Sequence, residues 1–452
     1  MKVTFVGHAS VIAELGSVGI WSDPWLQGDA FNDSWTLYPS PMIQEQDIAR
    51  VTHIWISHEH PDHLSIPTIA KCLSAEQKAK ITMLFQRHYD AEVVGWLRKQ
   101  GFKEVRELPH GEWVHLSPEC QVSCYQVGHI DSALAIRAAG ETILNINDCD
   151  LPDSTVKRIS RQLGRVDLLL NQFSIAGWSG NASDPARRRK AADDVLDKFL
   201  HDALRFNPRY ILPFASFIRF SHVENSYLNS AVNSLDEVVA RTGKERLLVM
   251  YPGDVWDSTL GPFKDTDDAL ARYRQDSSNV EAQPLRSHEA VPMEKILEAA
   301  NKRIADLQQK YHRPVLRWVV PVSFFVTDLN RSFVVDLING AKELELGCQA
   351  SCAVNLGSQA AWHAFAMRFG LPTLGVSGRF SINHSEQDFK RLKKLCSAYS
   401  SGLYTREAPR FGLGWRMLEF WWRRRLDIIP QFIKRLPFFE EGRAQSFAQS
   451  RA

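Results

Sequence analysis

The sequence predicts an α/β protein in which a large, multistranded first unit is followed by a smaller α+β unit. Between residues 1 and about 285, short runs rich in Val, Ile and aromatic residues alternate with turns and helical stretches; they include KVTFVG, GIWSD, HIWIS, ETILNIN and YILPF. Such runs, separated by helical segments, are typical of sheets covered by helices. At 452 residues the chain exceeds the size of one compact core, so we expect at least two domains.

Several of the predicted strands end in side chains that can carry chemistry. These residues are Asp23 after GIWS, His58 after HIWIS, His129 after YQVG, Asp148 after LNIN and His222 after ILPFASFIRFS. In α/β proteins, strand ends and the loops that follow them are where functional sites are built. We therefore expect these residues to approach one another at one end of the sheets.

The second predicted unit spans residues 290–400, after a polar and weakly periodic connector at 257–290. Good helix formers in MEKILEAANKRIADLQQKY predict its first helix. The elements expected next are the strands LRWVVPVSFFVTDL, RSFVVDLI and ELELGC, the helix SQAAWHAFAMRFG, the strand LGVSGRF and the helix SEQDFKRLKKLCSAYS. This is an α+β unit of ordinary domain size.

The tail, residues 405–452, is basic and aromatic. Between 411 and 436 its apolar residues recur at three- and four-residue steps, among them Trp415, Leu418, Trp422, Leu426 and Ile429, while arginines fall between them. Such an amphipathic helix can lie on an anionic membrane surface. The alternative is that it packs back on the body of the protein.

Composition restricts the partners. The net charge of +2 gives no general attraction to nucleic acid, so we expect no nucleic-acid partner. The N-terminal MKVTFVGHAS lacks the apolar core of a signal peptide, and seven scattered cysteines do not suggest a disulfide framework. We expect a cytoplasmic protein, with peripheral contact at the inner membrane surface if the tail binds lipid.

The strongest chemical signal is ISHEHPDHLS, residues 56–65. It gathers His58, His60, Asp62 and His63 in one loop between a predicted strand and a helix expected near Leu64. Imidazole together with carboxylate suits Zn, Fe or Mn better than Ca or Mg. The spacing permits His58 and His60 to converge on one ion, with Asp62 and His63 turned toward a second.

The His-x-His-x-Asp-His spacing resembles the signature loop of the metallo-β-lactamase superfamily, and the resemblance spans about residues 1–255. It implies an αββα sandwich and two metal ions, with further ligands after later strands. One ion is then expected to take His58, His60 and His129 from VGHID, the other Asp62, His63 and His222, and Asp148 from ILNINDCD is expected to bridge them, with Asp150 as its competitor.

The same resemblance assigns supporting roles. Asp23 in WSDPWL matches an aspartate that supports the metal loop, and His8 in VGHAS matches a histidine beside the site; neither is expected to bind metal. The metal-site carboxylates Asp62 and Asp148 are the expected catalytic residues.

A two-metal site can support hydrolysis, and with iron it can support oxidation. The segments DPWLQGDAF, ISHEHPDHLSIPT, LNINDCD and PFASFIRFSHVENSYL are similar to those of the CMP-N-acetylneuraminate and UDP-N-acetylmuramate hydroxylase families. This resemblance favours iron over zinc and implies hydroxylation of an N-acyl or similar unactivated carbon on a nucleotide sugar or lipid-linked small molecule.

One feature departs from those hydroxylases, which carry a Rieske cluster held by Cys-x-His and Cys-x-x-His. No cysteine in this sequence is followed by histidine at either spacing. We therefore expect no Rieske cluster in this chain and electrons from a separate protein. Two alternatives remain, namely a dinuclear zinc hydrolase of a phosphoester, ester or amide, and a lipid-binding or membrane-associated module with a residual metal site.

Substrate residues are less clearly indicated. Trp178 and Asn181 in IAGWSGNA follow a predicted strand and are candidates for the mouth of the site, and Arg219 is a candidate for a phosphate contact. Residues 290–400, with NLGSQAAWHAFAMRFG and LGVSGRF, resemble the sterol-carrier-protein-2 fold, some members of which enclose an apolar tunnel.

Overall fold

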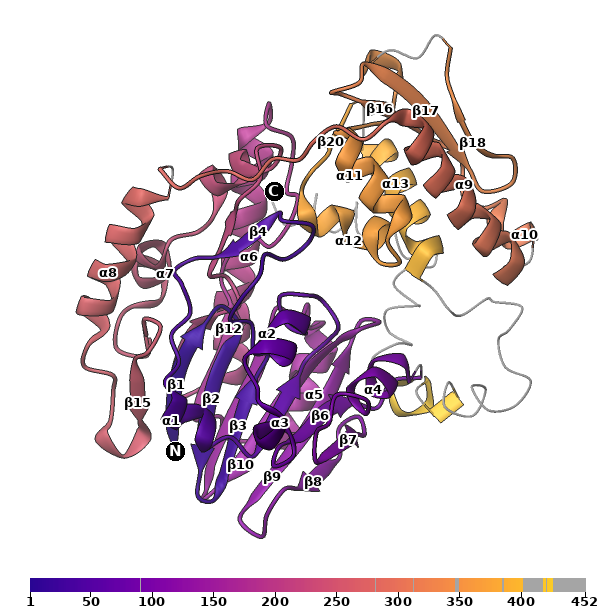
Figure 1. Ribbon diagram of the computed structural model, residues 1–452. Helices are drawn as coiled ribbons and strands as arrows, with labels where there is room; N and C mark the ends of the chain where they lie inside the picture. Colours follow the sequence, from indigo (N-terminus) through magenta and orange to yellow (C-terminus); the bar gives the residue numbers. More distant parts are fainter. Residues whose placement is uncertain are drawn as a thin grey trace, which may run out of the picture.

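The computed structural model describes residues 1–89, 91–280, 282–311, 313–345, 349–383, 386–400, 418–419 and 421–425. Its first unit contains two large sheets (Figure 1). One has the order β15 (Val255–Asp257), β1 (Lys2–Gly7), β2 (Ser10–Leu15), β3 (Val18–Ser22), β5 (His53–Ile56), β6 (Thr82–Gln86) and β7 (Glu104–Leu108). The other has the order β13 (Tyr210–Phe214), β12 (Leu168–Gln172), β11 (Glu141–Asn147), β10 (Asp131–Ala138), β9 (Cys120–Val127) and β8 (Trp113–His115).

The two sheets face each other across a shared apolar core. Successive side chains of a strand point to opposite faces, so alternate residues enter different cores. Val3 and Phe5 of β1 join the core between the sheets together with Leu134 and Ile136 of β10. Val6 of β1 instead joins the core on the outer face of the first sheet. The alternation thus makes both faces of each sheet apolar.

Helices cover the two outer faces. On the first sheet these are α2 (Ile66–Lys71) and α4 (Glu92–Leu97), and on the second α5 (Asp153–Leu163) and α6 (Pro185–Phe206). The remaining α-helices of this unit are α1 (Glu45–Ala49), α3 (Ala75–Lys78), α7 (Leu235–Thr242) and α8 (Thr266–Asn279). In addition, β4 (Trp35–Leu37) and β14 (Ile218–Phe220) form a short two-stranded antiparallel sheet. The expected αββα sandwich is confirmed.

The predicted connector at 257–290 is more ordered than its polar sequence suggests. It contains α8, whose residues Ala269, Leu270 and Tyr273 are buried in the core shared by the sheets. The spacing of these three residues places them on one helical face. The polarity of the segment reflects the solvent-facing side of this helix, so only the residues after α8 run between the two units.

The second unit has its own sheet, core and helices. The sheet order is β18 (Gly340–Glu343), β17 (Arg331–Asp336), β16 (Val322–Val326), β19 (Val354–Leu356) and β20 (Ser381–Ile382). It packs with α9 (Met293–Lys310), α10 (Arg313–Leu316), α11 (Ser358–Ala366), α12 (Gly370–Ser377) and α13 (Glu386–Ser400). The boundaries predicted for the two domains and the sterol-carrier-like fold remain predictions.

One predicted strand of this unit, LGVSGRF, is wrong. Most of it forms the end of α12, in which Leu371 and Leu374 are buried one helical turn apart. The helix ends at Gly378, whose φ of 69° lies in the left-handed region that glycine adopts without a steric penalty. Tertiary burial of the leucines overrides the weak helix propensity of this glycine-containing sequence.

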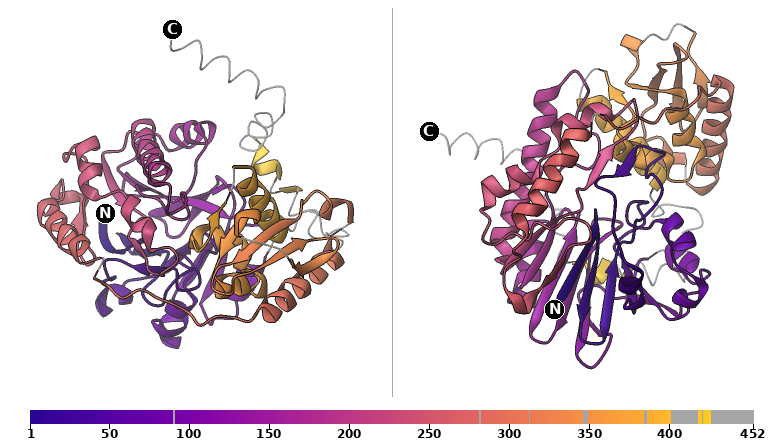
Figure 2. Two further views of the ribbon diagram at one scale, coloured as in Figure 1. Left: turned by 90° about the horizontal axis from the view of Figure 1, so that it is seen from above. Right: turned by 60° about the vertical axis from the view of Figure 1, so that its left-hand side comes forward.

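The second unit forms a separate lobe against the sandwich (Figures 1 and 2). Several polar contacts join the lobes, among them Arg187 with Glu386 and Asn32 with Gln359. The side-chain amide of Asn181 brackets the backbone of Ile382, with contacts of 2.6 and 3.0 Å, and Arg379 Nε donates to Glu224 Oε2 at 2.6 Å. None of the helices in the described ranges has the length and apolar character needed to cross a membrane.

Candidate metal centre

The loop after β5 brings its histidines together as the spacing predicts. The rings of His58 and His63 lie 4.1 Å apart between centroids, and His58 Nε2 lies 2.9 Å from His60 Nδ1. The loop is held at its far end by α2, where Ser65 Oγ accepts a hydrogen bond from Thr68 N. A side-chain cap of this kind fixes the start of a helix. Rigid elements therefore flank the cluster on both sides.

Asp23 orients this loop from the end of β3. Its carboxylate accepts hydrogen bonds from the backbone N–H and the hydroxyl of Ser57, both at 2.7 Å, and its Oδ2 lies 2.8 Å from His63 Nδ1. A carboxylate on one imidazole nitrogen fixes the tautomer and directs the other nitrogen toward a metal. The position of Asp23 agrees with its expected supporting role.

Asp148 lies against the same histidines at the end of β11. Its Oδ2 is 3.6 Å from His63 Nε2 and 3.9 Å from His58 Nε2, so these three residues can each offer a ligand atom to one ion. Its competitor Asp150 is 95 % exposed and has its carboxylate 3.8 Å from Lys198. The geometry thus favours Asp148 over Asp150.

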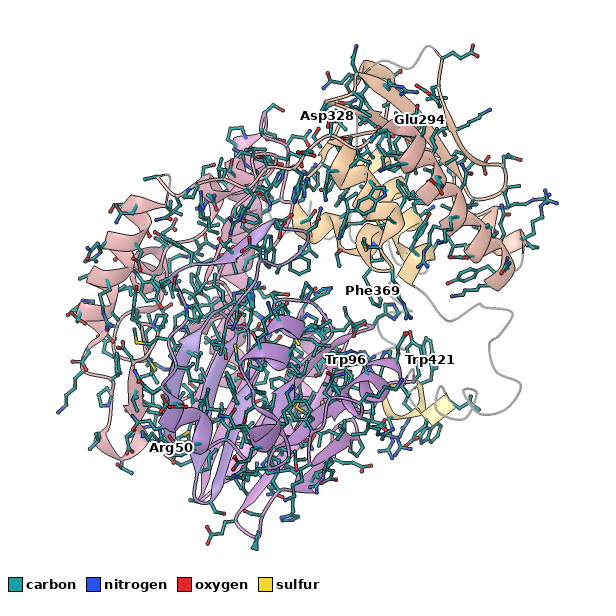
Figure 3. All side chains as sticks on the ribbon, viewed as in Figure 1. Arg50, Trp96, Glu294, Asp328, Phe369 and Trp421 are labelled. Atoms are coloured by element: carbon teal, nitrogen blue, oxygen red, sulfur yellow. The ribbon has the colours of Figure 1, made fainter. Side chains whose placement is uncertain are left out.

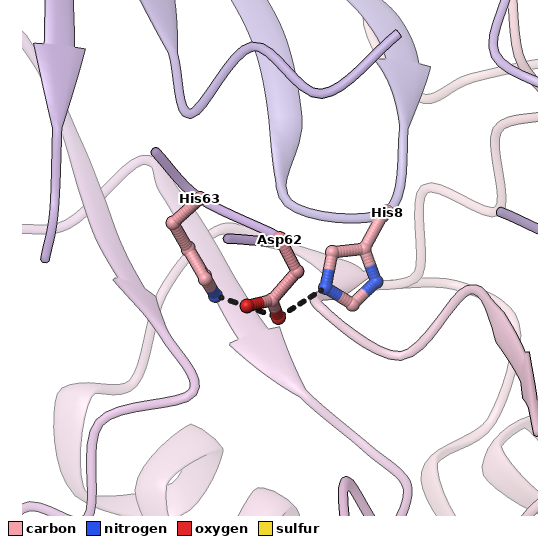
Figure 4. A group of neighbouring side chains, drawn as sticks. All are labelled: His8, Asp62 and His63. Carbon is pink, nitrogen blue, oxygen red and sulfur yellow. Dashed lines mark hydrogen bonds and ion pairs between the residues drawn. The ribbon is translucent and has the colours of Figure 1, made fainter. Parts of the chain in front are cut away.

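His8 and Asp62 form a second group with His63. Asp62 Oδ2 lies 3.3 Å from His8 Nε2 and 3.4 Å from His63 Nε2, and Figure 4 shows both rings directed at this carboxylate. His8 has a φ of 36°, in the region that non-glycine residues rarely adopt. Backbone strain of this kind clusters at functional sites. The contact with Asp62 and the strained backbone together indicate that His8 is part of the cluster.

Asp131, the first residue of β10, also reaches the cluster, and the sequence prediction missed it. Its Oδ1 lies 3.9 Å from His58 Nε2. Burial, together with the carboxylate of Asp148, raises the pKa of Asp131 to about 7. The signal was present in VGHID, because residues 129 and 131 are two positions apart and Asp131 is as suitable a ligand type as His129.

The donor atoms of the cluster suit a cation. His63 Nε2, Asp62 Oδ1 and Asp148 Oδ1 are buried and have no hydrogen-bond partner within the described part of the chain. Burial lowers the pKa of His60 to about 4, which leaves a neutral imidazole. Burial opposes charge on His63 too, but the carboxylates around it raise its pKa well above the usual value. Carboxylates gathered around imidazole nitrogens, with the charge of His63 stabilised where a cation would lie, fit a metal centre.

His129 and His222 lie in different surroundings. His129 is exposed in the turn before β10, and its backbone carbonyl accepts a hydrogen bond from His88 Nε2 at 2.7 Å. His222 stacks on His288, with His222 Nε2 3.1 Å from His288 Nδ1. Neither belongs to the two groups that could hold an ion among the described residues. Their assignment as ligands stays a prediction.

The three predicted substrate residues make structural contacts, and their role in substrate binding stays a prediction. Trp178 stacks on Phe380 of the second unit at 5.1 Å, and Asn181 holds the backbone of Ile382. Arg219 is buried and donates to the carbonyl oxygens of residues 283 and 284 at 2.6 and 3.1 Å. These contacts fix the second lobe and the connector on the sandwich.

No family model matches the chain. The cytidine monophosphate-N-acetylneuraminic acid hydroxylase of Xenopus laevis is 25% identical over 274 residues, which cover 54% of this chain and 45% of that protein. The inactive human counterpart is 25% identical over 278 residues, covering 57% and 54%. The chain thus spans about half the length of the curated relatives it matches.

Among solved structures, the diiron β-hydroxylase CmlA from Streptomyces venezuelae is 18% identical, with a TM-score of 0.36 and coverage of 47% of this chain and 44% of that one. The αββα sandwich and the histidine-rich loop after β5 together define the class: the chain has the metallo-β-lactamase fold. The curated relatives reported above are N-acetylneuraminate hydroxylases.

Proposed function

We propose that the protein is a dinuclear metal oxygenase that hydroxylates an N-acyl or similar unactivated carbon of a small molecule. The observation that carries the proposal is the donor set: three carboxylates, from Asp62, Asp131 and Asp148, lie within 4 Å of imidazole nitrogens in one buried cluster. Histidine combined with carboxylate is the donor set of non-haem iron oxygenases. Similarity to hydroxylases supports the same assignment.

Two sets of residues would hold the ions. His58, His60 and Asp131 would serve one ion, and His8, Asp62 and His63 the other. Asp148 lies within 4 Å of both His58 and His63, so its carboxylate is placed to bridge. In this proposed set, Asp131 and His8 stand where the sequence prediction has His129 and His222, whose assignment as ligands stays a prediction.

A pair of iron ions at such a site would supply activation of dioxygen. Asp23 and Ser57 orient the rings of His58 and His63, because Ser57 contacts both rings and Asp23 contacts that of His63. Preorganised ligands of this kind do not need to move during a reaction cycle. Electrons are proposed to come from a donor that this sequence does not contain, since it lacks Rieske ligand spacings.

The proposed substrate is a nucleotide sugar, or a lipid-linked molecule, that carries an N-acyl group. The support is the similarity to hydroxylases whose name specifies a cytidine monophosphate sugar acid. The zinc hydrolase is the competing function, since two ions can also activate water.

Metal analysis of protein purified without added metal tests the proposal. We expect iron in excess of zinc and, after addition of an N-acylated nucleotide sugar and a reductant, a product heavier by one oxygen atom. Zinc in stoichiometric amount, together with cleavage of an ester or phosphoester in the absence of reductant, would overturn the oxygenase and favour the hydrolase.

A further inference from the structure

The turn Gly128–Ile130, between β9 and β10, leads directly into Asp131, and each of its three carbonyl oxygens accepts a hydrogen bond from a distant side chain. Arg424 Nη1 donates to the first at 2.7 Å, and His88 Nε2 donates to the second at 2.7 Å. Gln86 Nε2 donates to the third. A turn held at three successive carbonyls has little freedom to move the carboxylate that follows it.

Arg424 is the most distant of these three donors in sequence. It belongs to a short helical segment of the tail, residues 418–419 and 421–425, which we call the C-terminal clasp (yellow in Figure 1; Trp421 is labelled in Figure 3). Glu419 of the clasp lies 3.0 Å from Arg87, and Arg423 pairs with Glu112. These ion pairs fix the clasp on the sandwich beside the turn.

The guanidinium of Arg424 is unusual in being buried: the residue is only 3 % exposed. A charged group removed from water is costly unless it is well hydrogen-bonded. The neighbouring Arg425 has no need of buried hydrogen-bond partners, because its side chain is exposed to solvent. It contacts Trp422 of the same segment. Of the two adjacent arginines, only Arg424 joins the clasp to the turn that carries Asp131.

We propose that Arg424 is a positioning residue for the metal centre, which holds the turn Gly128–Ile130 so that Asp131 stays aimed at His58. The clasp thereby couples the tail of the chain to the affinity of the ion beside Asp131. The inference rests on the metal site of the proposed function, but it is independent of which metal is bound and which reaction follows. Groups that hydrogen-bond a metal ligand directly typically change metal affinity by about 10- to 100-fold, and Arg424, which acts through the backbone of the turn, is expected at the lower end of this range.

The test is a cobalt titration of the full-length, metal-depleted protein, followed by its visible absorption, for wild type, Arg424→Ala, Arg424→Lys and Arg425→Ala. We expect Arg424→Ala to weaken binding of one of two cobalt ions by roughly tenfold, with a changed spectrum, and Arg424→Lys to restore part of the loss. Arg425→Ala should match wild type. In an Asp131→Asn background, Arg424→Ala should have no further effect, because its action passes through that carboxylate.

Hydrogen exchange of amides 128–132 without metal provides a second readout. Faster exchange in Arg424→Ala than in Arg425→Ala supports the clasp, even if wild type binds no cobalt and the proposed function fails. Unchanged exchange, or equal cobalt affinity in the two variants, overturns the inference and leaves the proposed function intact. If Arg424→Ala does not fold, the same comparison between Arg424→Lys and Arg425→Lys decides.

Discussion

Asp23 Oδ2 lies 2.8 Å from His63 Nδ1, and this contact directs the opposite ring nitrogen, Nε2, toward the carboxylates of Asp62 and Asp148. Asp23 also accepts two hydrogen bonds from Ser57. One buried carboxylate, outside the proposed ligand set, therefore sets both the ring orientation of His63 and the course of the loop that follows β5.

The first prediction concerns this contact. Asp23→Asn keeps the shape of the side chain but lets its amide face His63 with a donor, so the ring loses its fixed tautomer. We expect metal affinity to fall by about 10- to 100-fold, measured by competition with a chelator. Asp47→Asn is the control, because Asp47 is also buried but pairs with Arg50. Equal affinities of the two variants would contradict the orienting role.

The second prediction separates Asp148 from Asp150. Asp148→Asn removes the carboxylate placed between His58 and His63, whereas Asp150→Asn changes an exposed residue two positions away. We expect the first variant to lose most of its bound metal and the second to keep it, by elemental analysis after gel filtration. Retention of metal by Asp148→Asn would exclude it as the bridge.

The third prediction decides between Asp131 and His129 as the additional ligand beside His58. Asp131 Oδ1 is 3.9 Å from His58 Nε2, and His129 is exposed in the preceding turn. We expect Asp131→Asn to weaken binding of one ion and His129→Asn to leave both ions bound, measured by calorimetric titration. The reverse pattern would restore the ligand set expected from the family resemblance.

The fourth prediction concerns the two lobes. Arg379 is 2 % exposed and pairs with Glu224 at 2.6 Å, next to the loop that carries His222. Because Glu224 is partly exposed, we expect Arg379→Ala to cost about 2–3 kcal/mol of unfolding free energy, less than for a fully buried pair. Urea unfolding measures this difference.

The control for the lobe contact is Arg274→Ala. Arg274 pairs with Asp236 at the same distance, 2.6 Å, but both side chains are largely exposed. A clearly smaller loss is expected, since exposed pairs contribute little to stability. Losses of equal size in the two variants would show that the lobe contact adds no stability of its own.

The metal-binding loop and the sandwich could be predicted from the sequence because both depend on short-range patterns. Alternation along β1 and β10 fixes which side chains enter which core, and His-x-His-x-Asp-His needs only one loop to bring its side chains together. Asp148 was also identifiable, since it directly follows a buried strand.

Contacts between residues far apart in the sequence could not be predicted from local patterns. His222 faces His288, which lies on the segment after α8, and no local pattern places that segment beside β14. Asp131 was passed over because the family pattern names a histidine two residues earlier. The residues of α12 have low helix propensity, and their helix depends on burial within the second lobe.

The prediction for the tail can be compared with the structure over only a few residues. Of the region predicted to contact a membrane, 411–436, only residues 418–419 and 421–425 belong to the described part of the chain. There, Arg424 and Glu419 contact the sandwich while Trp422 is exposed. Membrane contact through the rest of the tail stays a prediction and lies outside the described residues.

Oxygen uptake by the iron-loaded, chemically reduced protein distinguishes the proposed oxygenase from a hydrolase. We expect about two iron ions per chain and rapid consumption of dioxygen that is lost in Asp148→Asn and retained in Asp150→Asn. Absence of oxygen uptake by the iron-loaded wild type, in a protein that as purified contains zinc and hydrolyses an ester or phosphoester, would contradict the proposed oxygenase.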